Sequence, residues 1–301
     1  MPTGSELLRT HAPDVADALD AVVATTWATT AGHGTTDVVA EAARRVAGLH
    51  GLEPLTPPAA DGDRGPTAPT GDGEAAVLAF AEQCGLDVSA VTPGQRSAFL
   101  AAAGPGAGDL AAALWVVDVL PRTRAALDAL ATPGPWPEPA PTHAGGDLWA
   151  ALDGIIRTVP ALGALDPVTS ELVRLRVARQ HRCRLCMSIR SRPAVRAGAD
   201  EATFGAVDRH PTSDLDPLAR AALALVDAMV WTPGRIDPAV AAALAAEATP
   251  AQQVEVVVDV TRNALNKVAV ALGADAAHVT EGTELYEVAP DGTMTYGLTL
   301  D

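Results

Sequence analysis

The chain marks the start of several helices with the same two residues, a capping residue followed by proline. An Asp or Thr side chain accepts hydrogen bonds from the free backbone N–H groups of a first helical turn, and proline suits the first helical position because no donor is needed there. The pairs are Thr92-Pro93, Asp166-Pro167, Asp216-Pro217, Asp237-Pro238 and Thr249-Pro250. Gln252 adds a capping box to the last of them. The pattern restricts the chain to a fold built mainly from helices.

The composition indicates an all-α fold. Apolar residues make up 48% of the 301 residues, and only 3% of the chain is aromatic. The apolar surplus is mostly alanine, a strong helix former, and long runs of Val, Ile, Thr and Tyr are scarce. The helices predicted after residue 147 cover 148–158, 167–180, 183–197, 201–208, 217–230, 238–247 and 250–272. Pro193 predicts a kink or break in the third of these, after Arg190, because proline lacks an N–H donor.

Two halves of the chain resemble each other across a stretch rich in Pro and Gly. Val116-Val117-Asp118-Val119 in the first half recurs as Val257-Val258-Asp259-Val260 in the second. We therefore expect a duplicated helical unit. Its parts are a first repeat at 1–130, a linker at 131–146, a second repeat at 147–275 and a tail at 276–301. The first repeat has Thr29 and Gly32 where the second has Cys183 and Cys186, so it lacks the thiol pair.

The tail has a different pattern. Residues 283–288 and 293–298 alternate in character around Ala289-Pro290-Asp291-Gly292, which predicts a short β-hairpin or arm. Because an isolated hairpin is only marginally stable, we expect it to pack on its own chain or on a neighbouring subunit.

Charge and hydropathy exclude several classes of protein. The net charge of −16 and the pI near 4.7 argue against a nucleic-acid binder, which needs a broad basic surface. The first 20 residues lack the apolar core of a signal peptide, and no uninterrupted apolar run is long enough to cross a membrane. We therefore expect a cytoplasmic protein without a membrane partner.

Cys183 and Cys186 form a C-x-x-C pair in the one strongly basic stretch of this acidic chain. Between Glu171 and Arg196 the only acid is Glu171, against eight arginines: Arg174, Arg176, Arg179, Arg182, Arg184, Arg190, Arg192 and Arg196. A positive field favours the thiolate, the form of cysteine that acts as a nucleophile. This stretch is therefore the candidate site.

The spacing leaves three interpretations of the thiol pair. Residues at i and i+3 of a helix share a face, so the two sulfurs can close a disulfide near a helix start, where the macrodipole lowers a thiol pKa. Two buried small residues are the second interpretation, and half of a zinc site is the third. Zinc needs four ligands, so Cys84, His181 or His210 would have to converge on the pair. C-x-x-C in a reducing compartment indicates redox or metal-binding chemistry. Because the chain offers no second C-x-x-C, we favour redox chemistry without a metal or other cofactor.

The second half, over about 147–275, resembles the carboxymuconolactone decarboxylase and AhpD-like alkylhydroperoxidase family. The resemblance rests on Glu171-Leu172-Val173-Arg174-Leu175-Arg176-Val177-Ala178, Cys183-Arg184-Leu185-Cys186, Arg196-Ala197-Gly198-Ala199-Asp200, Asn263-Ala264-Leu265-Asn266 and Ala271-Leu272-Gly273. The thiol branch of the family carries the spacing E-x11-C-x2-C-x3-H. Glu171, Cys183 and Cys186 satisfy it.

The resemblance implies an all-helical, oligomeric enzyme and a role for each site residue. Cys186 would attack peroxide, Cys183 would resolve the disulfide, and Glu171 would relay a proton. The dipole argument alone favours Cys183, which is nearer the helix start, as the thiolate. A second interpretation of Glu171 is a helix-end acid that pairs with Arg174.

This chain departs from the family where the histidine should stand, because it has Arg190 there. An arginine can hold a thiolate or pair with Glu171, but it cannot relay protons. His181, two residues before Cys183, is a possible substitute. The alternative for His181 is a cap or an exposed loop position.

We therefore expect a thiol peroxidase or disulfide oxidoreductase without metal, haem or flavin. Its partners would be a peroxide or small organic substrate, a thiol reductant or redox partner protein, and further copies of the same chain. The alternatives are a lactone decarboxylase-like enzyme acting on an organic acid, and a non-catalytic redox sensor or scaffold.

Overall fold

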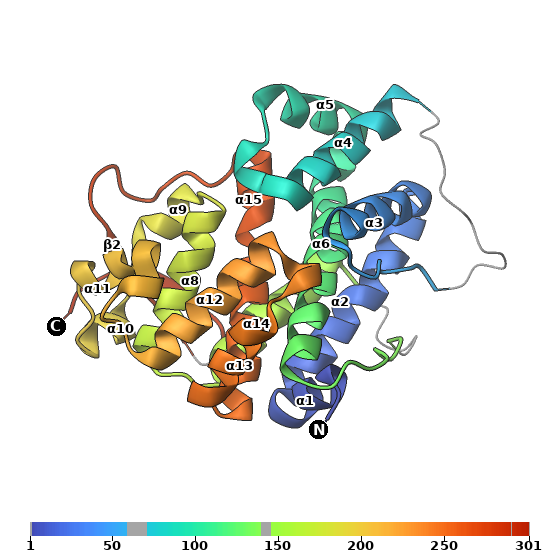
Figure 1. The fold of residues 1–301 in the computed structure, drawn as a ribbon. Helices are drawn as coiled ribbons and strands as arrows, with labels where there is room; N and C mark the ends of the chain where they lie inside the picture. Colours follow the sequence, from blue (N-terminus) through green and yellow to red (C-terminus); the bar gives the residue numbers. More distant parts are fainter. Residues whose placement is uncertain (1, 59–70, 140–145, 290, 301) are drawn as a thin grey trace.

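The structure is a computed structural model of the full chain, and it describes residues 2–58, 71–139, 146–289 and 291–300. Most of these residues are helical (Figure 1). The first half contributes α1 (Gly4–His11), α2 (Pro13–Gly32), α3 (Thr36–His50), α4 (Asp72–Asp87), α5 (Pro93–Ala103) and α6 (Ala107–Leu130). The second half contributes α7 (Leu148–Thr158), α8 (Pro167–Gln180), α9 (Arg184–Met187), α10 (Arg192–Arg196), α11 (Glu201–Gly205), α12 (Pro217–Trp231), α13 (Pro238–Glu247), α14 (Pro250–Asn263) and α15 (Asn266–Leu272).

The capping residues predicted from the sequence cap the helices. The side chains of Thr92, Asp166, Asp216, Asp237 and Thr249 each accept a backbone N–H of the helix that follows. The predicted ranges 148–158, 167–180 and 238–247 match α7, α8 and α13, and α12 runs one residue past its predicted end. The all-α prediction is therefore confirmed, with a small sheet in addition.

Three predicted helices are interrupted. The range 183–197 is wrong as a single helix, because it contains the one-turn α9, the strand β1 (Ile189–Ser191) and the short α10. The predicted break comes earlier than expected, at Ser188, and Pro193 lies in the first turn of α10. The range 201–208 is α11 followed by a 3-10 segment over Ala206–Thr212, and 250–272 is divided into α14 and α15.

The C-terminal hairpin is confirmed and packs on its own chain. Its strands, β2 (Glu284–Val288) and β3 (Met294–Leu298), are antiparallel, and β1 joins β2 in parallel to complete a three-stranded sheet. The register places Ser191 opposite Tyr286. Pro290, in the turn, lies outside the described residues. The sheet brings the tail to the segment that directly follows the thiols.

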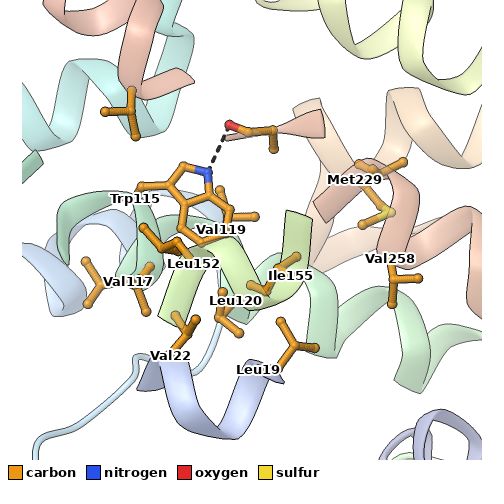
Figure 2. Close-up of a cluster of buried hydrophobic side chains, with 14 of the residues drawn as sticks. Leu19, Val22, Trp115, Val117, Val119, Leu120, Leu152, Ile155, Met229 and Val258 are labelled. Carbon is orange, nitrogen blue, oxygen red and sulfur yellow. Dashed lines mark hydrogen bonds between the residues drawn. The ribbon is translucent and has the colours of Figure 1, made fainter. Parts of the chain in front are cut away.

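One hydrophobic core runs through both halves of the chain. Figure 2 shows Leu19, Val22, Trp115 and Leu120 of the first half near Ile155, Met229 and Val258 of the second. The indole N–H of Trp115 donates to the backbone oxygen of Ala264 across 2.9 Å. A smaller core beside it consists of second-half residues such as Leu172 and Phe204. The two repeats stay a prediction, and residues 140–145 of the expected linker lie outside the described residues.

One described helical stretch, Pro93–Leu130, is long and apolar enough by length and composition to cross a membrane. Half of its most apolar window is buried inside the protein. The core helix of a soluble protein passes the same test, and α6 supplies Leu114, Trp115 and Val117 to the core. The stretch is therefore only weak support for a membrane span.

Candidate functional site

Cys183 and Cys186 are joined by a disulfide, with their Cα atoms 5.3 Å apart. Cys183 is the N-cap of α9, and its Sγ accepts the backbone N–H of Cys186 at 3.2 Å. The turn begins at Arg182, whose φ of 51° is in the left-handed region and ends α8. Because α9 has only four residues, the macrodipole of a long helix is not available to favour Cys183.

The two sulfurs differ in exposure. Cys183 is 1% exposed and belongs to the hydrophobic core, whereas Cys186 is partly exposed at its edge. A molecule arriving from solvent therefore meets Cys186 first. The family resemblance implies attack by Cys186, and this order of attack stays a prediction.

Asp275, just beyond α15, holds the thiol turn in place. Its carboxylate accepts the backbone N–H of Arg184 at 2.9 Å and the Arg184 guanidinium at 2.7 Å. Its backbone oxygen accepts the N–H of Leu185 at 2.9 Å. Hydrogen bonds from Arg184 lower the pKa of Asp275 despite its burial, so the carboxylate stays ionised. The sequence interpretation missed Asp275.

Glu171 is buried in an ion pair with Arg174. The Arg174 guanidinium donates two hydrogen bonds of 2.7 Å to the carboxylate, which also accepts the Ser191 N–H at 3.1 Å and the Tyr286 hydroxyl at 3.0 Å. Burial lowers the pKa of Arg174, but the charge of Glu171 outweighs it and the net shift is upward. This geometry matches the second interpretation of Glu171, a partner for Arg174. Its role as a proton relay stays a prediction.

Arg174 connects this ion pair to the thiol turn. It donates to the backbone oxygens of Cys186 at 2.8 Å and Ile189 at 3.0 Å. In a continuous helix the Cys186 oxygen would accept the N–H of Arg190 instead. The buried guanidinium therefore fixes the path of the chain after the thiols.

Arg190 pairs with Glu201, and among the hydrogen bonds of the described residues none joins it to either sulfur or to Glu171. Its guanidinium lies 2.9 and 3.1 Å from the two Glu201 oxygens, and it also donates to the oxygens of Met187 and Ile189. The guanidinium carbon lies 5.3 Å from the centre of the Phe204 ring. Arg190 is therefore placed to hold the segment after the thiols.

His181 is buried at the C-terminal end of α8 and reaches the thiols through Asn266. The His181 Nδ1 lies 2.7 Å from Asn266 Oδ1, and Asn266 Nδ2 lies 3.7 Å from Cys186 Sγ. Burial and the charge of Lys267 lower the pKa of His181 to about 3, so the ring is neutral near pH 7. His181 thus occupies a cap position, as one interpretation had it. Asn266 was missed as a site residue, although it ends a motif on which the resemblance rests.

The first half of the chain contributes to the surroundings of His181. Lys267 forms a buried ion pair with Asp118 of α6, which also pairs with Arg122 at 2.8 Å. A small pocket beside His181 is lined by Cys84, Leu86, Gln180, Trp231 and Lys267, among others. Residues from both halves therefore surround one side of the candidate site.

In the described part of the chain, no three His, Cys, Asp or Glu side chains are grouped so that they could hold a metal ion. The zinc interpretation therefore has no ligand set among these residues. His210, one of the ligands considered, lies 3.0 Å from Asp227. The thiols instead bond to each other.

Comparison with known proteins gives one family and two relatives. Residues 145–228 match the carboxymuconolactone decarboxylase family. Two Mycobacterium tuberculosis proteins are each 43% identical over 235 residues, which is 76% of this chain and 83% of the relative. They are the uncharacterized protein MT2376 of strain CDC 1551 / Oshkosh and the uncharacterized protein Rv2313c of strain ATCC 25618 / H37Rv. No solved structure matches the chain significantly. A match of 235 residues necessarily includes part of the first half.

Proposed function

Because the chain belongs to the carboxymuconolactone decarboxylase family, we propose that it is a thiol peroxidase or disulfide oxidoreductase that uses Cys183 and Cys186. The observation that carries the proposal is the disulfide between these residues, with one sulfur buried and the other partly exposed. A buried thiol next to an exposed one suits a pair in which one attacks and the other resolves.

The proposed cycle begins with the reduced pair. The Cys186 thiolate attacks one oxygen of a hydroperoxide, the O–O bond breaks, and the leaving oxygen takes a proton to become an alcohol or water. Cys186 is then a sulfenic acid. The Cys183 sulfur attacks the Cys186 sulfur, the S–S bond forms, and the hydroxyl leaves as water. A dithiol reductant then exchanges with the disulfide, which returns both cysteines to thiols as the reductant becomes oxidised.

Proton transfer is the weak part of this site. The Glu171 carboxylate is held in an ion pair with Arg174, and the His181 ring is neutral because its pKa is low. Arg190 cannot give up a proton. Water at the partly exposed Cys186 is then the proton source for the leaving oxygen. General acid–base help contributes about 10² to 10⁴ in rate, so we expect slow turnover.

The test is turnover of cumene hydroperoxide with dithiothreitol as the dithiol reductant. We expect the wild-type chain and Cys84→Ser to consume peroxide above the uncatalysed rate, and Cys186→Ser to fall to that rate. A wild-type chain that oxidises once without cycling would support the redox-sensor alternative. Unchanged thiols together with decarboxylation of a lactone acid would support the other branch of the family.

The partners and the compartment are part of the proposal. A family unit that meets copies of itself can, after duplication, bury one such contact within the chain and others between chains, so we propose a homo-oligomer. A stable monomer at micromolar concentration in light scattering would contradict it. We place the protein in the cytoplasm, where reductants keep a dithiol available.

A further inference from the structure

We infer that Asn266 stabilises the Cys186 thiolate through its side-chain N–H, and that His181 is the positioning residue that orients the Asn266 amide. The inference rests on the proposed thiol chemistry. It gives a role to two residues of the site, of which Asn266 was absent from the sequence prediction.

The chemistry of His181, Asn266 and Cys186 fixes which group donates and which accepts in each hydrogen bond. The Asn266 Oδ1, 2.7 Å from His181 Nδ1, is a carbonyl oxygen and can only accept, so the ring nitrogen must carry the proton. With its oxygen held by His181, the amide presents its NH₂ group to Cys186 Sγ at 3.7 Å. A donor that faces a sulfur favours the charged thiolate over the neutral thiol.

The two sulfurs accept hydrogen bonds from different donors. Cys183 Sγ accepts a backbone N–H, that of Cys186. Cys186 Sγ accepts a side-chain N–H, that of Asn266. A substitution can therefore remove the donor to Cys186 while it leaves the donor to Cys183 unchanged.

Three of the charged groups near the thiol turn are paired, and a fourth, Arg182, is exposed. On α8, Arg174 is bound to Glu171 and to the Cys186 backbone oxygen. On α9, Arg184 is bound to Asp275. On α15, Lys267 is bound to Asp118 of α6. Among the described residues, Asn266 is thus the one side chain that donates a hydrogen bond to Cys186 Sγ.

His181 can hold the amide because it stays neutral and buried. Its exposure is 5%, and burial together with Lys267 keeps its pKa near 3. The ring therefore keeps one proton over the working pH range, and the bond to Asn266 fixes that proton on Nδ1. Without the ring, the Asn266 amide could turn its oxygen toward the sulfur.

The experiment measures the alkylation rate of Cys186 against pH in the reduced full-length chain, with iodoacetamide and peptide mass mapping. Asn266→Asp keeps the size of the side chain but replaces the donor with a carboxylate. We expect the thiol pKa of Cys186 to rise and its alkylation at pH 7 to slow by roughly tenfold. His181→Phe should slow it by a smaller factor, in the same direction.

Asn263→Asp is the matched control. Asn263 lies three residues before Asn266, and its Nδ2 donates within α14 to the backbone oxygen of Asp259. The Asn263→Asp substitution introduces the same charge without a contact to the sulfur. The pH profile of Cys186 alkylation should therefore stay close to that of wild type. Asn266→Ala compared with Asn263→Ala removes the donor without adding a charge, and only Asn266→Ala should raise the Cys186 pKa.

An unchanged Cys186 profile in a cooperatively folded Asn266 variant would overturn the inference. The outcome is separable from that of the proposed function, because alkylation needs no peroxide turnover. A wild-type chain that fails to turn over peroxide, with a Cys186 profile that depends on Asn266, would remove the proposed function and leave this inference standing.

Discussion

The Tyr286 hydroxyl donates a hydrogen bond to Glu171 across 3.0 Å, which joins the C-terminal hairpin to the helix before the thiols. The same strand pairs with Ile189–Ser191, directly after the thiol turn. Burial and the charge of Glu171 raise the pKa of Tyr286, so the hydroxyl keeps its proton and remains a donor. The tail is therefore part of the support of the candidate site.

Glu171→Gln should destabilise the chain strongly. It leaves the buried Arg174 guanidinium without its counter-charge, which costs about 3–5 kcal/mol. Tyr286→Phe is the milder comparison, because it removes one hydrogen bond worth about 1 kcal/mol. Urea denaturation gives both free energies of unfolding. A normally stable Glu171→Gln chain that has lost turnover would instead favour the proton-relay role of Glu171.

Arg190→Ala should lower stability and leave the Cys186 thiol pKa unchanged. The guanidinium binds Glu201 and the oxygens of Met187 and Ile189, so its loss frees the segment after the thiols. We expect a loss of about 2 kcal/mol, as for hydrogen bonds from a charged group. Glu201→Ala should cost less, since the Glu201 side chain is 66% exposed. A raised Cys186 pKa in Arg190→Ala would restore Arg190 as a thiolate partner.

Cys84 should resist alkylation in the folded, reduced chain. Burial raises the pKa of its thiol to about 12, so little thiolate exists at pH 8. Mass mapping after brief iodoacetamide treatment should find Cys186 labelled well before Cys84. In denaturant the two thiols should be labelled at similar rates. Equal labelling of both in the folded chain would contradict the raised thiol pKa of Cys84.

Asp259→Asn should stabilise the chain at pH 8. Burial and the neighbouring Glu255 raise the pKa of Asp259 from 3.8 to about 7, and its Oδ2 has no hydrogen-bond partner among the described residues. The folded state thus prefers the protonated acid, and this contribution is lost as pH rises from about 4 to about 7. A gap of about three pKa units corresponds to at most about 4 kcal/mol.

Thermal unfolding of Asp259→Asn and wild type between pH 4 and pH 8 measures this effect. The advantage of the variant should grow with pH and level off above pH 7. Asp214→Asn, at an exposed position, should show no such trend. An advantage that is constant with pH would mean that Asp259 is ionised in the fold throughout the range.

The helix starts could be predicted because capping is local. Asp166, Asp216 and Asp237 accept hydrogen bonds from N–H groups within three residues. Both partners of each interaction are therefore visible in a short stretch of sequence. The interruption of 183–197 depends instead on Arg174, which takes the backbone oxygens of Cys186 and Ile189. Helical periodicity carries no signal of such a contact.

In the candidate site, too, one part could be predicted from the sequence and another depends on contacts between distant residues. The spacing of Glu171, Cys183 and Cys186 identified the thiol pair, because cysteine chemistry and family spacing are both visible in the sequence. The contact of Asn266 with Cys186 spans 80 residues and depends on how α15 meets α9. Only its position in a motif quoted for the resemblance pointed to Asn266.

The most direct test of the account is to oxidise reduced Cys183→Ser with one equivalent of hydrogen peroxide in the presence of dimedone, which traps sulfenic acids, and to map the label. We predict one label per chain, on Cys186, whereas the wild type forms the Cys183–Cys186 disulfide and takes little label. Cys186→Ser should leave the buried Cys183 largely unlabelled. Efficient labelling of Cys183 in Cys186→Ser, with Cys186 unlabelled in Cys183→Ser, would contradict the assignment of Cys186 as the attacking sulfur.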